Sequence, residues 1–474
     1  MDAAQQSTPA NTLDRRTRVL LEAPVLSTLL KMAAPNMLVM LAQMSIGLVE
    51  VYFVARLGVD ALAGASLVFP MLSLISAVSQ GAVGGGVVTA IARALGRGQR
   101  GQANQLVWYA VAIAAVFGLL TSAIILSAGP LFYRAMGAEG ESLVVATTYS
   151  SIVFGGSILI WAFNLLLAAV RGTGNLLLPV GIVCGGMLIL LPLSPILIFG
   201  HGPLPAFGVA GAATAVLLYY AGGSLCFALF LWGGGGTLCP SAMPPRLSWA
   251  PFREILRVGG MSALVSATTN LTIAIITAYV GTAGVTALAG YGAGARLEFI
   301  LVPLSYGIGG PAGILIGTNV GAGESGRALR TAWITVLLSA LATEAIGLAA
   351  ATWPSVWIGS FSNDPAVLAI GTTYLRTVGP LFGFFGIGYA LYCAGQGTGR
   401  MGWPVAGAVT RAAIAVVGGA AAIRVGASLE HIFMAVSLGM MSFGLFSLPG
   451  LFYRSVNGTQ RSSAACGPTA GCTR

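Results

Sequence analysis

The chain has 474 residues, of which 56% are hydrophobic and only 8% charged, with a formal net charge of +10. Soluble proteins carry about 25% charged residues, and a mean hydropathy of +0.88 leaves too little polar chain to cover a globular core. The composition excludes an ordinary soluble protein and predicts a chain that spans a lipid bilayer.

Apolar segments long enough to cross a bilayer recur along the whole sequence. About 20 residues of helix cross ~30 Å of hydrocarbon, whereas a membrane barrel needs short alternating strands. The expected spans are 30–55, 62–91, 105–128, 144–169, 177–199, 207–232, 255–280, 287–316, 331–352, 367–393, 403–424 and 431–452. The predicted fold class is therefore an all-α polytopic membrane protein with twelve transmembrane helices.

Positive charges gather in alternate connections between these spans. Seventeen Lys and Arg residues fall on one side of the membrane, and only Arg56, Arg134 and Arg424 fall on the other. Short loops rich in Lys and Arg stay in the cytoplasm, so both termini are expected to be cytoplasmic and the protein to lie in the cell (inner) membrane. The basic charge is interpreted as topology and lipid headgroup contact, not as a nucleic-acid surface.

Three sequence motifs occur twice, in the same order and at a nearly constant offset of 225 or 226 residues. The pairs are GVDALAG (58–64) with GVTALAG (284–290), LGRGQRGQA (95–103) with VGAGESGRA (320–328), and RGTGNLLLPV (171–180) with QGTGRMGWPV (396–405). This pattern indicates an internal duplication of six helices. Because six is even, the two copies enter from the same side, and the repeat is parallel with a central cleft between two lobes.

The duplication sets the expected domain organisation. The domains are a cytoplasmic N-terminal tail (1–28), an N-lobe of six helices (29–232), a cytoplasmic interlobe linker (233–253), a C-lobe of six helices (254–453) and a cytoplasmic C-terminal tail (454–474). The linker is rich in Gly and Pro and has no helical periodicity. The N-terminal tail is interpreted as retained, because the first apolar run is too long for a signal peptide.

Three stretches resemble the multidrug and toxic compound extrusion (MATE) family of secondary transporters, prokaryotic type. They are AAPNMLVMLAQMSIGLVEVYFVARLGVDALAG (33–64), NLLLAAVRGTGN (164–175) and PILIFGHGPLPAFGVAGAATA (195–215). The resemblance implies an antiporter that exports small amphiphilic or cationic compounds in exchange for H⁺ or Na⁺. Glu50 corresponds to the acidic residue that the family carries in its first helix, and Asn164 to an asparagine in the fourth.

The chain departs from the family in its fifth span. Leu190 and Ser194 stand where many relatives carry Asn and Asp, so a sodium site built from several oxygen ligands is disfavoured relative to proton coupling.

Asn36, Gln43 and Glu50 lie seven residues apart and form one polar stripe on the first helix. A charge in hydrocarbon costs about 2.5–3.5 kcal/mol even on the gentlest scale, so the stripe is expected to line the cleft or a lobe interior. The candidate proton or ion-coupling site is Glu50 with Asn164 and Gln43 as partners. Interhelical hydrogen bonding is the alternative interpretation. The candidate substrate-cleft residues are Asn36, Glu298, Ser194 and Thr269.

Charged residues also fall inside the spans of the second half. Arg296, Glu344 and Arg376 are expected to form structural ion pairs, with Glu344 or Glu298 holding the arginines. Glu298 lies deeper and has the better claim to a substrate or coupling role. Pro35 and Pro303 can kink their helices and allow bending.

The sequence also bears on other classes of function. A flippase or exporter of a lipid-linked or metabolite substrate in the same superfamily is the alternative, although a strongly basic cleft is not apparent. An enzyme is not expected, because motifs for intramembrane hydrolysis or metal chemistry are absent, and no filter-like loop indicates a channel. Six cysteines without ligand spacing and two histidines predict no metal and no cofactor. The expected partners are a small-molecule substrate, H⁺ or Na⁺ and the bilayer, with no nucleic acid, and the chain is expected to be a monomer.

Overall fold

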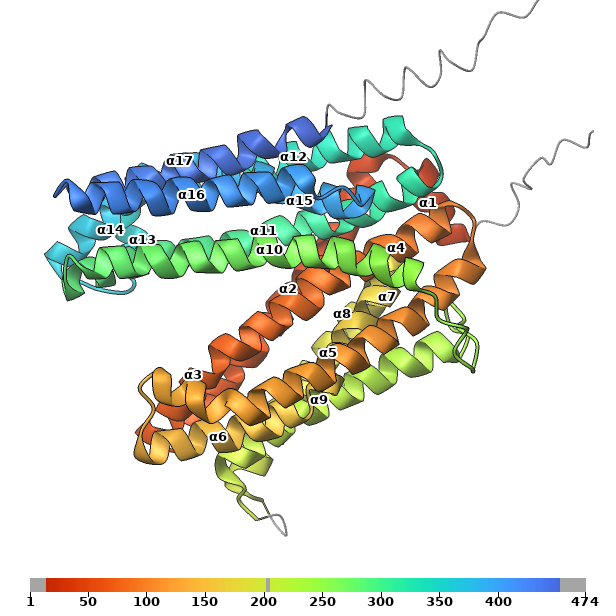
Figure 1. Cartoon of the computed structure of the whole chain (residues 1–474), viewed down its shortest axis with the longest axis horizontal. Coiled ribbons are helices and arrows are strands. Elements are labelled where there is room, and N and C mark those ends of the chain that lie inside the picture. The colour runs from red at the N-terminus through yellow and green to blue at the C-terminus, as the bar shows by residue number, and fades with distance from the viewer. Residues whose placement is uncertain (1–13, 202–204, 452–474) are drawn as a thin grey trace, which may run out of the picture. The chain divides into compact units, whose positions relative to one another are not determined.

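The computed structural model describes residues 14–201 and 205–451, and every regular element in these ranges is a helix (Figure 1). The first half holds α1 (Arg15–Glu22), α2 (Val25–Ala55), α3 (Val59–Ser76), the π-helical turn η1 (Ala77–Val83), α4 (Gly84–Gly96), α5 (Arg100–Ala135), α6 (Gly140–Gly155), α7 (Ser157–Gly172), α8 (Leu177–Phe199) and α9 (Gly208–Trp232). The second half holds α10 (Trp249–Gly281), α11 (Val285–Gly321), α12 (Ser325–Thr352), α13 (Pro354–Ile358), α14 (Pro365–Val378), the 3-10 turn η2 (Gly379–Leu381), α15 (Phe382–Thr398), α16 (Gly402–Arg424) and α17 (Leu429–Ser447).

The described helices confirm the predicted all-α polytopic fold. Eleven spans are long and apolar enough to cross a membrane, and the pair α6–α7 makes a twelfth when it counts as one bent span. Each expected span lies on one of them, and the helices extend several residues past many of the predicted ends. Helices suit this environment because every backbone polar group is satisfied within the segment.

The fourth span is broken where two glycines meet. Helix α6 ends at Gly155, and the axes of α6 and α7 differ by 50° across the break at Gly156. Ser122 of α5 donates a hydrogen bond to the carbonyl oxygen of Phe154 at 2.6 Å. A side-chain donor from the neighbouring helix therefore supports the backbone at the point where the helix changes direction.

The repeated GTG turn has the same backbone conformation in both copies. Gly174 follows α7 with φ +79°, and Gly399 follows α15 with φ +74°. Glycine adopts this left-handed region without the clash that a Cβ atom would cause. The duplicated sequence therefore encodes a duplicated local structure.

The chain divides into two compact units that do not follow the repeat boundary. The first comprises 1–266, 306–331 and 396–399, and the second comprises 267–305, 332–395 and 400–474. The expected linker, 233–253, covers the non-helical connection between α9 and α10. Parts of the second half nevertheless pack within the first unit, and the predicted lobe boundaries stay a prediction. The expected C-terminal tail lies outside the described residues, as do residues 1–13 of the expected N-terminal tail, whose remaining residues form α1 and the start of α2.

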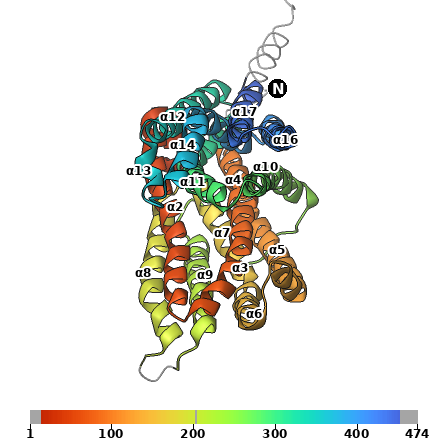
Figure 2. The ribbon, with the colours of Figure 1, turned by 90° about the vertical axis from the view of Figure 1, so that its left-hand side faces the viewer.

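Within the first unit, α8 lies beside α2 and α9 (Figure 2). A core at one end of this bundle joins aromatic and aliphatic side chains that are fully buried, among them Val68, Tyr149, Phe154 and Ile160. Large apolar side chains such as Leu48, Leu131 and Leu225 point outward instead. An outward apolar surface of this kind is what contact with lipid requires.

Within the second unit, α16 and α17 pack side by side (Figure 1), and α14 packs against α17. An aromatic cluster links these helices to α11. The ring centroid of Tyr374 lies 5.2 Å from that of Tyr291 and 5.1 Å from that of Phe433. Tyr374 of this cluster also donates a hydrogen bond to the carboxylate of Glu298 on α11.

Candidate functional site

Glu50, the predicted coupling residue, lies in the C-terminal third of the long helix α2 and is 2% exposed. Its carboxylate accepts a hydrogen bond from the hydroxyl of Tyr149 on α6, which is itself fully buried. Within the described residues no Lys, Arg or His forms an ion pair with Glu50. The first unit therefore holds a buried carboxyl group that has a neutral hydrogen-bond donor and no cationic partner among the described residues.

Gln43 and Asn164 do not bind Glu50, so the predicted hydrogen-bond partners are wrong. The Gln43 side-chain oxygen accepts from Nε2 of Gln80 at 2.6 Å. Asn164 Nδ2 donates to the hydroxyl of Ser79 at 2.8 Å. Ser79 and Gln80 both belong to η1, and π-helical turns inside α-helices frequently occur at functional sites. The two predicted polar residues therefore hold this turn in place.

Glu298 in the second unit has a partner that the sequence analysis missed. Its carboxylate lies 3.7 Å from a guanidinium nitrogen of Arg411 on α16, and the two side chains are 12% and 6% exposed. It also accepts a hydrogen bond from the hydroxyl of Tyr374. Glu298 is thus a paired charge, in contrast to Glu50.

The ion pairs predicted for Arg296, Glu344 and Arg376 are not formed. Arg296 is exposed and lies over the ring of Phe361, 5.0 Å from its centroid. Glu344 accepts the backbone N–H of Gly383 at 2.6 Å, and Arg376 is exposed. The prediction fails because similar depth in two helices does not make their side chains face each other.

The remaining predicted residues are the other cleft candidates and the two prolines within helices. Ser194 is buried in α8, and Thr269 is half-buried in α10. Helix α2 continues through Pro35, and α11 continues through Pro303, so bending at these prolines stays a prediction. Asn36 lies in a polar cluster with Arg171.

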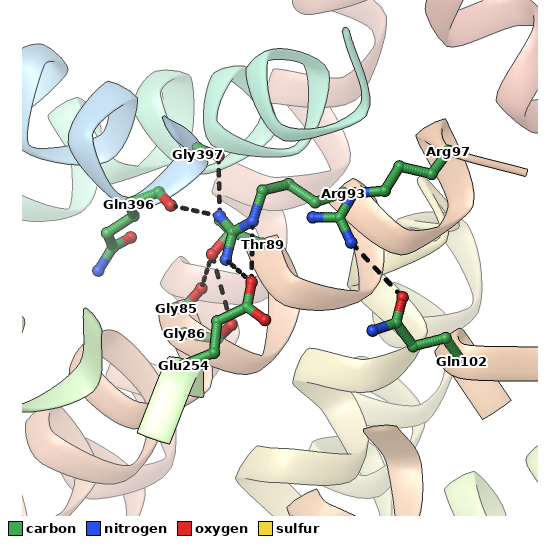
Figure 3. Close-up of polar contacts among 9 residues, drawn as sticks. All are labelled: Gly85, Gly86, Thr89, Arg93, Arg97, Gln102, Glu254, Gln396 and Gly397. Carbon is green, nitrogen blue, oxygen red and sulfur yellow. Dashed lines mark hydrogen bonds and ion pairs between the residues drawn. The ribbon is translucent and has the colours of Figure 1, made fainter. Parts of the chain in front are cut away.

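Arg93 on α4 is the centre of a junction between segments from both halves of the chain (Figure 3). Its Nη2 lies 2.9 Å from Oε1 of Glu254 on α10. Its Nη1 donates to the carbonyl oxygens of Gln396 at 3.1 Å and Gly397 at 2.9 Å, at the end of α15. The side chain is 6% exposed, while that of Glu254 is 39% exposed. Within the first unit, one guanidinium therefore holds α4, the start of α10 and the end of α15 together.

A second polar cluster of the first unit follows the internal repeat. Arg171 donates to Oδ1 of Asn36, whose Nδ2 donates to the carbonyl oxygen of Tyr306 at 3.1 Å. In the matching arrangement, Gln396 donates to Oγ of Ser262 and to the carbonyl oxygen of Gly81, each at 3.0 Å. Arg171 and Gln396 are repeat equivalents, as are Asn36 and Ser262. The duplicated turns thus present equivalent side chains to equivalent partners.

Tyr149 and Arg411 were not predicted from the sequence. The same is true of the contacts made by Arg93 at the end of α4 and Arg171 at the end of α7. Arg411 carried a usable signal, because it is the sole charge within the predicted span 403–424 before its final residue. Tyr149 carried none, since an aromatic residue in an apolar span is ordinary.

Comparison with known proteins gives consistent matches over most of the chain. The family model described as MatE matches residues 35–196 and 262–421. An FAD transporter of Shewanella oneidensis is 29% identical over 78% of this chain and 81% of its own length. A probable multidrug resistance protein NorM of Thermotoga maritima is 27% identical over 78% of this chain and 80% of its own length. Among solved structures, a MATE protein in the bent conformation covers 95% of this chain and 100% of its own, with TM-score 0.87 and 21% identity.

Proposed function

Because the chain belongs to the MATE family of membrane transporters, we propose that it exports small amphiphilic, cationic compounds in exchange for protons by alternating access. One observation carries the proposal. Glu50 is a deeply buried carboxyl group, and no ion pair with a cationic side chain satisfies it within the described residues. A group of this kind in a transmembrane helix is a functional site by default.

Protons fit this site better than sodium does. A sodium ion needs several oxygen ligands, whereas Glu50 has one neutral hydroxyl donor, that of Tyr149. Leu190, which stands where many relatives carry a polar side chain, offers no oxygen from its side chain. A proton needs the carboxylate alone.

The proposed cycle uses the change in charge at Glu50. In the charged state the carboxylate attracts a cationic substrate and holds the hydroxyl of Tyr149. Protonation from outside the cell removes the charge, weakens the attraction for the cation and releases it. Bending of α2 at Pro35 and opening at the Arg93 junction then allow the proton to leave on the cytoplasmic side.

Transport of ethidium, a fluorescent cation, across the membrane of proteoliposomes tests this proposal. The assay is run under an imposed pH gradient, once with and once without a sodium gradient. Glu50→Gln mimics the protonated form, so it should retain ethidium binding yet lose uphill export. Glu141→Gln, which alters an exposed carboxylate of α6, is the matched control and should transport normally. Full activity of Glu50→Gln, or drive by sodium alone, would overturn the proposal.

A second candidate function is export of a phosphate-bearing metabolite. The relative of Shewanella oneidensis that is 29% identical to this chain is named an FAD transporter. The same liposomes loaded with flavin adenine dinucleotide distinguish the candidates. Export of the dinucleotide with no export of ethidium would favour the metabolite.

A further inference from the structure

Three arginines are buried in the described part of the chain, and one of them differs from the other two. Arg93 pairs with Glu254 at 2.9 Å, and Arg411 pairs with Glu298 at 3.7 Å. Arg171 is 3% exposed and forms no ion pair with a described carboxylate. Its guanidinium donates to the amide oxygen of Asn36 and lies 5.5 Å from the ring centroid of Tyr306. A buried cation without a counter-charge is strongly destabilising.

Arg171 borders a small cavity within the first unit. The space measures about 10 Å³, and its walls include Gly85, Thr89, Tyr306, Gly310 and Gln396. No acidic residue lines it. A volume of about 10–15 Å³ is the least that holds one water-sized group, so the cavity has room for one small group at most and excludes a phosphate group.

The guanidinium of Arg171 has further N–H donors that can bind a group in this cavity. An arginine carries five N–H donors, and Nη2 is the nitrogen of Arg171 that donates to a described residue, Asn36. Water in the cavity would accept a hydrogen bond but would leave the positive charge uncompensated. An anion does both.

Glycines keep this space open. A Cβ atom added to Gly310 would lie 3.1 Å from Nδ2 of Asn36 and 3.4 Å from a terminal nitrogen of Arg171. A Cβ atom added to Gly85, the repeat equivalent, would lie 2.5 Å from Nε2 of Gln396. Any larger residue at either position would press on the polar side chains that surround the cavity.

We propose that this cavity binds a single monovalent inorganic anion, chloride in the cell, as the counter-ion of Arg171. The bound anion stabilises the arrangement within the first unit in which α4 and α7 meet the ends of α11 (from residue 306) and α15 (from residue 396). The repeat equivalent Gln396 is neutral, so the duplicated fold needs one such ion and not two.

The test measures the thermal unfolding midpoint of the purified full-length protein in detergent. Potassium chloride replaces potassium gluconate in steps at constant ionic strength. Gluconate serves as the reference because this anion is too large for the cavity. The wild-type midpoint should rise with chloride and saturate, as binding to the folded state requires. Arg171→Gln should remove the rise, while Arg97→Gln, an exposed arginine of the same unit, should keep it. A flat wild-type response, or an equal rise in Arg171→Gln, would overturn the proposal.

A second variant supplies the missing negative charge. Asn36→Asp places a carboxylate in the contact that Arg171 already makes, so its midpoint should no longer respond to chloride, whatever its absolute value. A full chloride response in Asn36→Asp would count against the site. Crystals grown with potassium bromide give a direct check. An anomalous peak beside the Arg171 guanidinium is expected, and bromide peaks elsewhere only would refute the assignment.

Discussion

At the scale of single residues, Tyr149 and Tyr374 occupy equivalent positions of the repeat, 225 residues apart. Each donates its hydroxyl hydrogen to a glutamate on another helix, Glu50 in one case and Glu298 in the other. The two glutamates are not themselves repeat equivalents. They differ in one respect that matters for transport, since Arg411 neutralises Glu298.

Replacing the two tyrosines should separate these roles. In Tyr149→Phe, Glu50 loses its hydrogen bond, a contact worth about 1.5–3 kcal/mol for a charged group, and proton-driven ethidium export should fall several-fold. In Tyr374→Phe, Glu298 keeps its ion pair, and export per folded molecule should stay near the wild-type rate. Initial rates in proteoliposomes, normalised to inserted protein, provide the comparison. Equal losses in the two variants would contradict the assignment of Glu50.

The Arg411–Glu298 pair should contribute to stability. Arg411→Gln leaves a buried carboxylate without its counter-charge, which typically costs about 3–5 kcal/mol. Its unfolding midpoint in detergent should therefore drop well below that of Arg424→Gln, which alters an exposed arginine on the same helix. Combining Glu298→Gln with Arg411→Gln should recover part of the loss. If the double variant is no more stable than Arg411→Gln, the ion pair does not hold the unit together.

At the scale of elements, the Arg93 junction joins α4, α10 and the end of α15. Arg93→Gln removes the ion pair with Glu254 and leaves two carbonyl oxygens without their donor. We expect the junction to open more often. A cysteine at Ser262, which is fully buried beside Gln396, should then react faster with a maleimide in a background without the native cysteines.

Arg97→Gln is the matched control, because Arg97 lies one turn further on and its exposed side chain donates to Oε1 of Gln102 at 3.4 Å. Labelling of the Ser262 cysteine should be as slow in this variant as in the parent. A faster rate in both variants, or in neither, would show that the junction does not control access.

The elements themselves were largely predictable, because their signals are local. Apolar length locates the spans, and the repeated GTG turn predicts the positive φ of Gly174 and Gly399. Contacts between elements were not predictable in the same way. Whether Asn164 faces Glu50 or Ser79 depends on the rotation and depth of two helices, which a single sequence does not encode at residue resolution. The three residues of the predicted polar stripe all lie on α2, while the partners predicted for Glu50 were wrong.

At the scale of the whole molecule, the distribution of positive charge predicts which connections face the cytoplasm. Single cysteines at Gly137 and Asn363 should react with a membrane-impermeant maleimide added to intact cells. Cysteines at Gly98 and Gly323 should react only after the membrane is permeabilised. The reverse pattern would show that the orientation deduced from Lys and Arg is inverted. If only some of the four cysteines react on the expected side, the twelve-span arrangement is contradicted.

The unpaired carboxyl group of Glu50 also has an electrical consequence. If this group alone changes its protonation during transport, one proton enters for each substrate that leaves. Exchange of one proton for a monovalent cation moves no net charge, so the membrane voltage neither drives nor opposes it. A dication would instead be exported against about 2.3 kcal/mol for every 100 mV. The number of buried carboxylates that have no cationic partner thereby determines which substrates a cell can expel with its pH gradient alone.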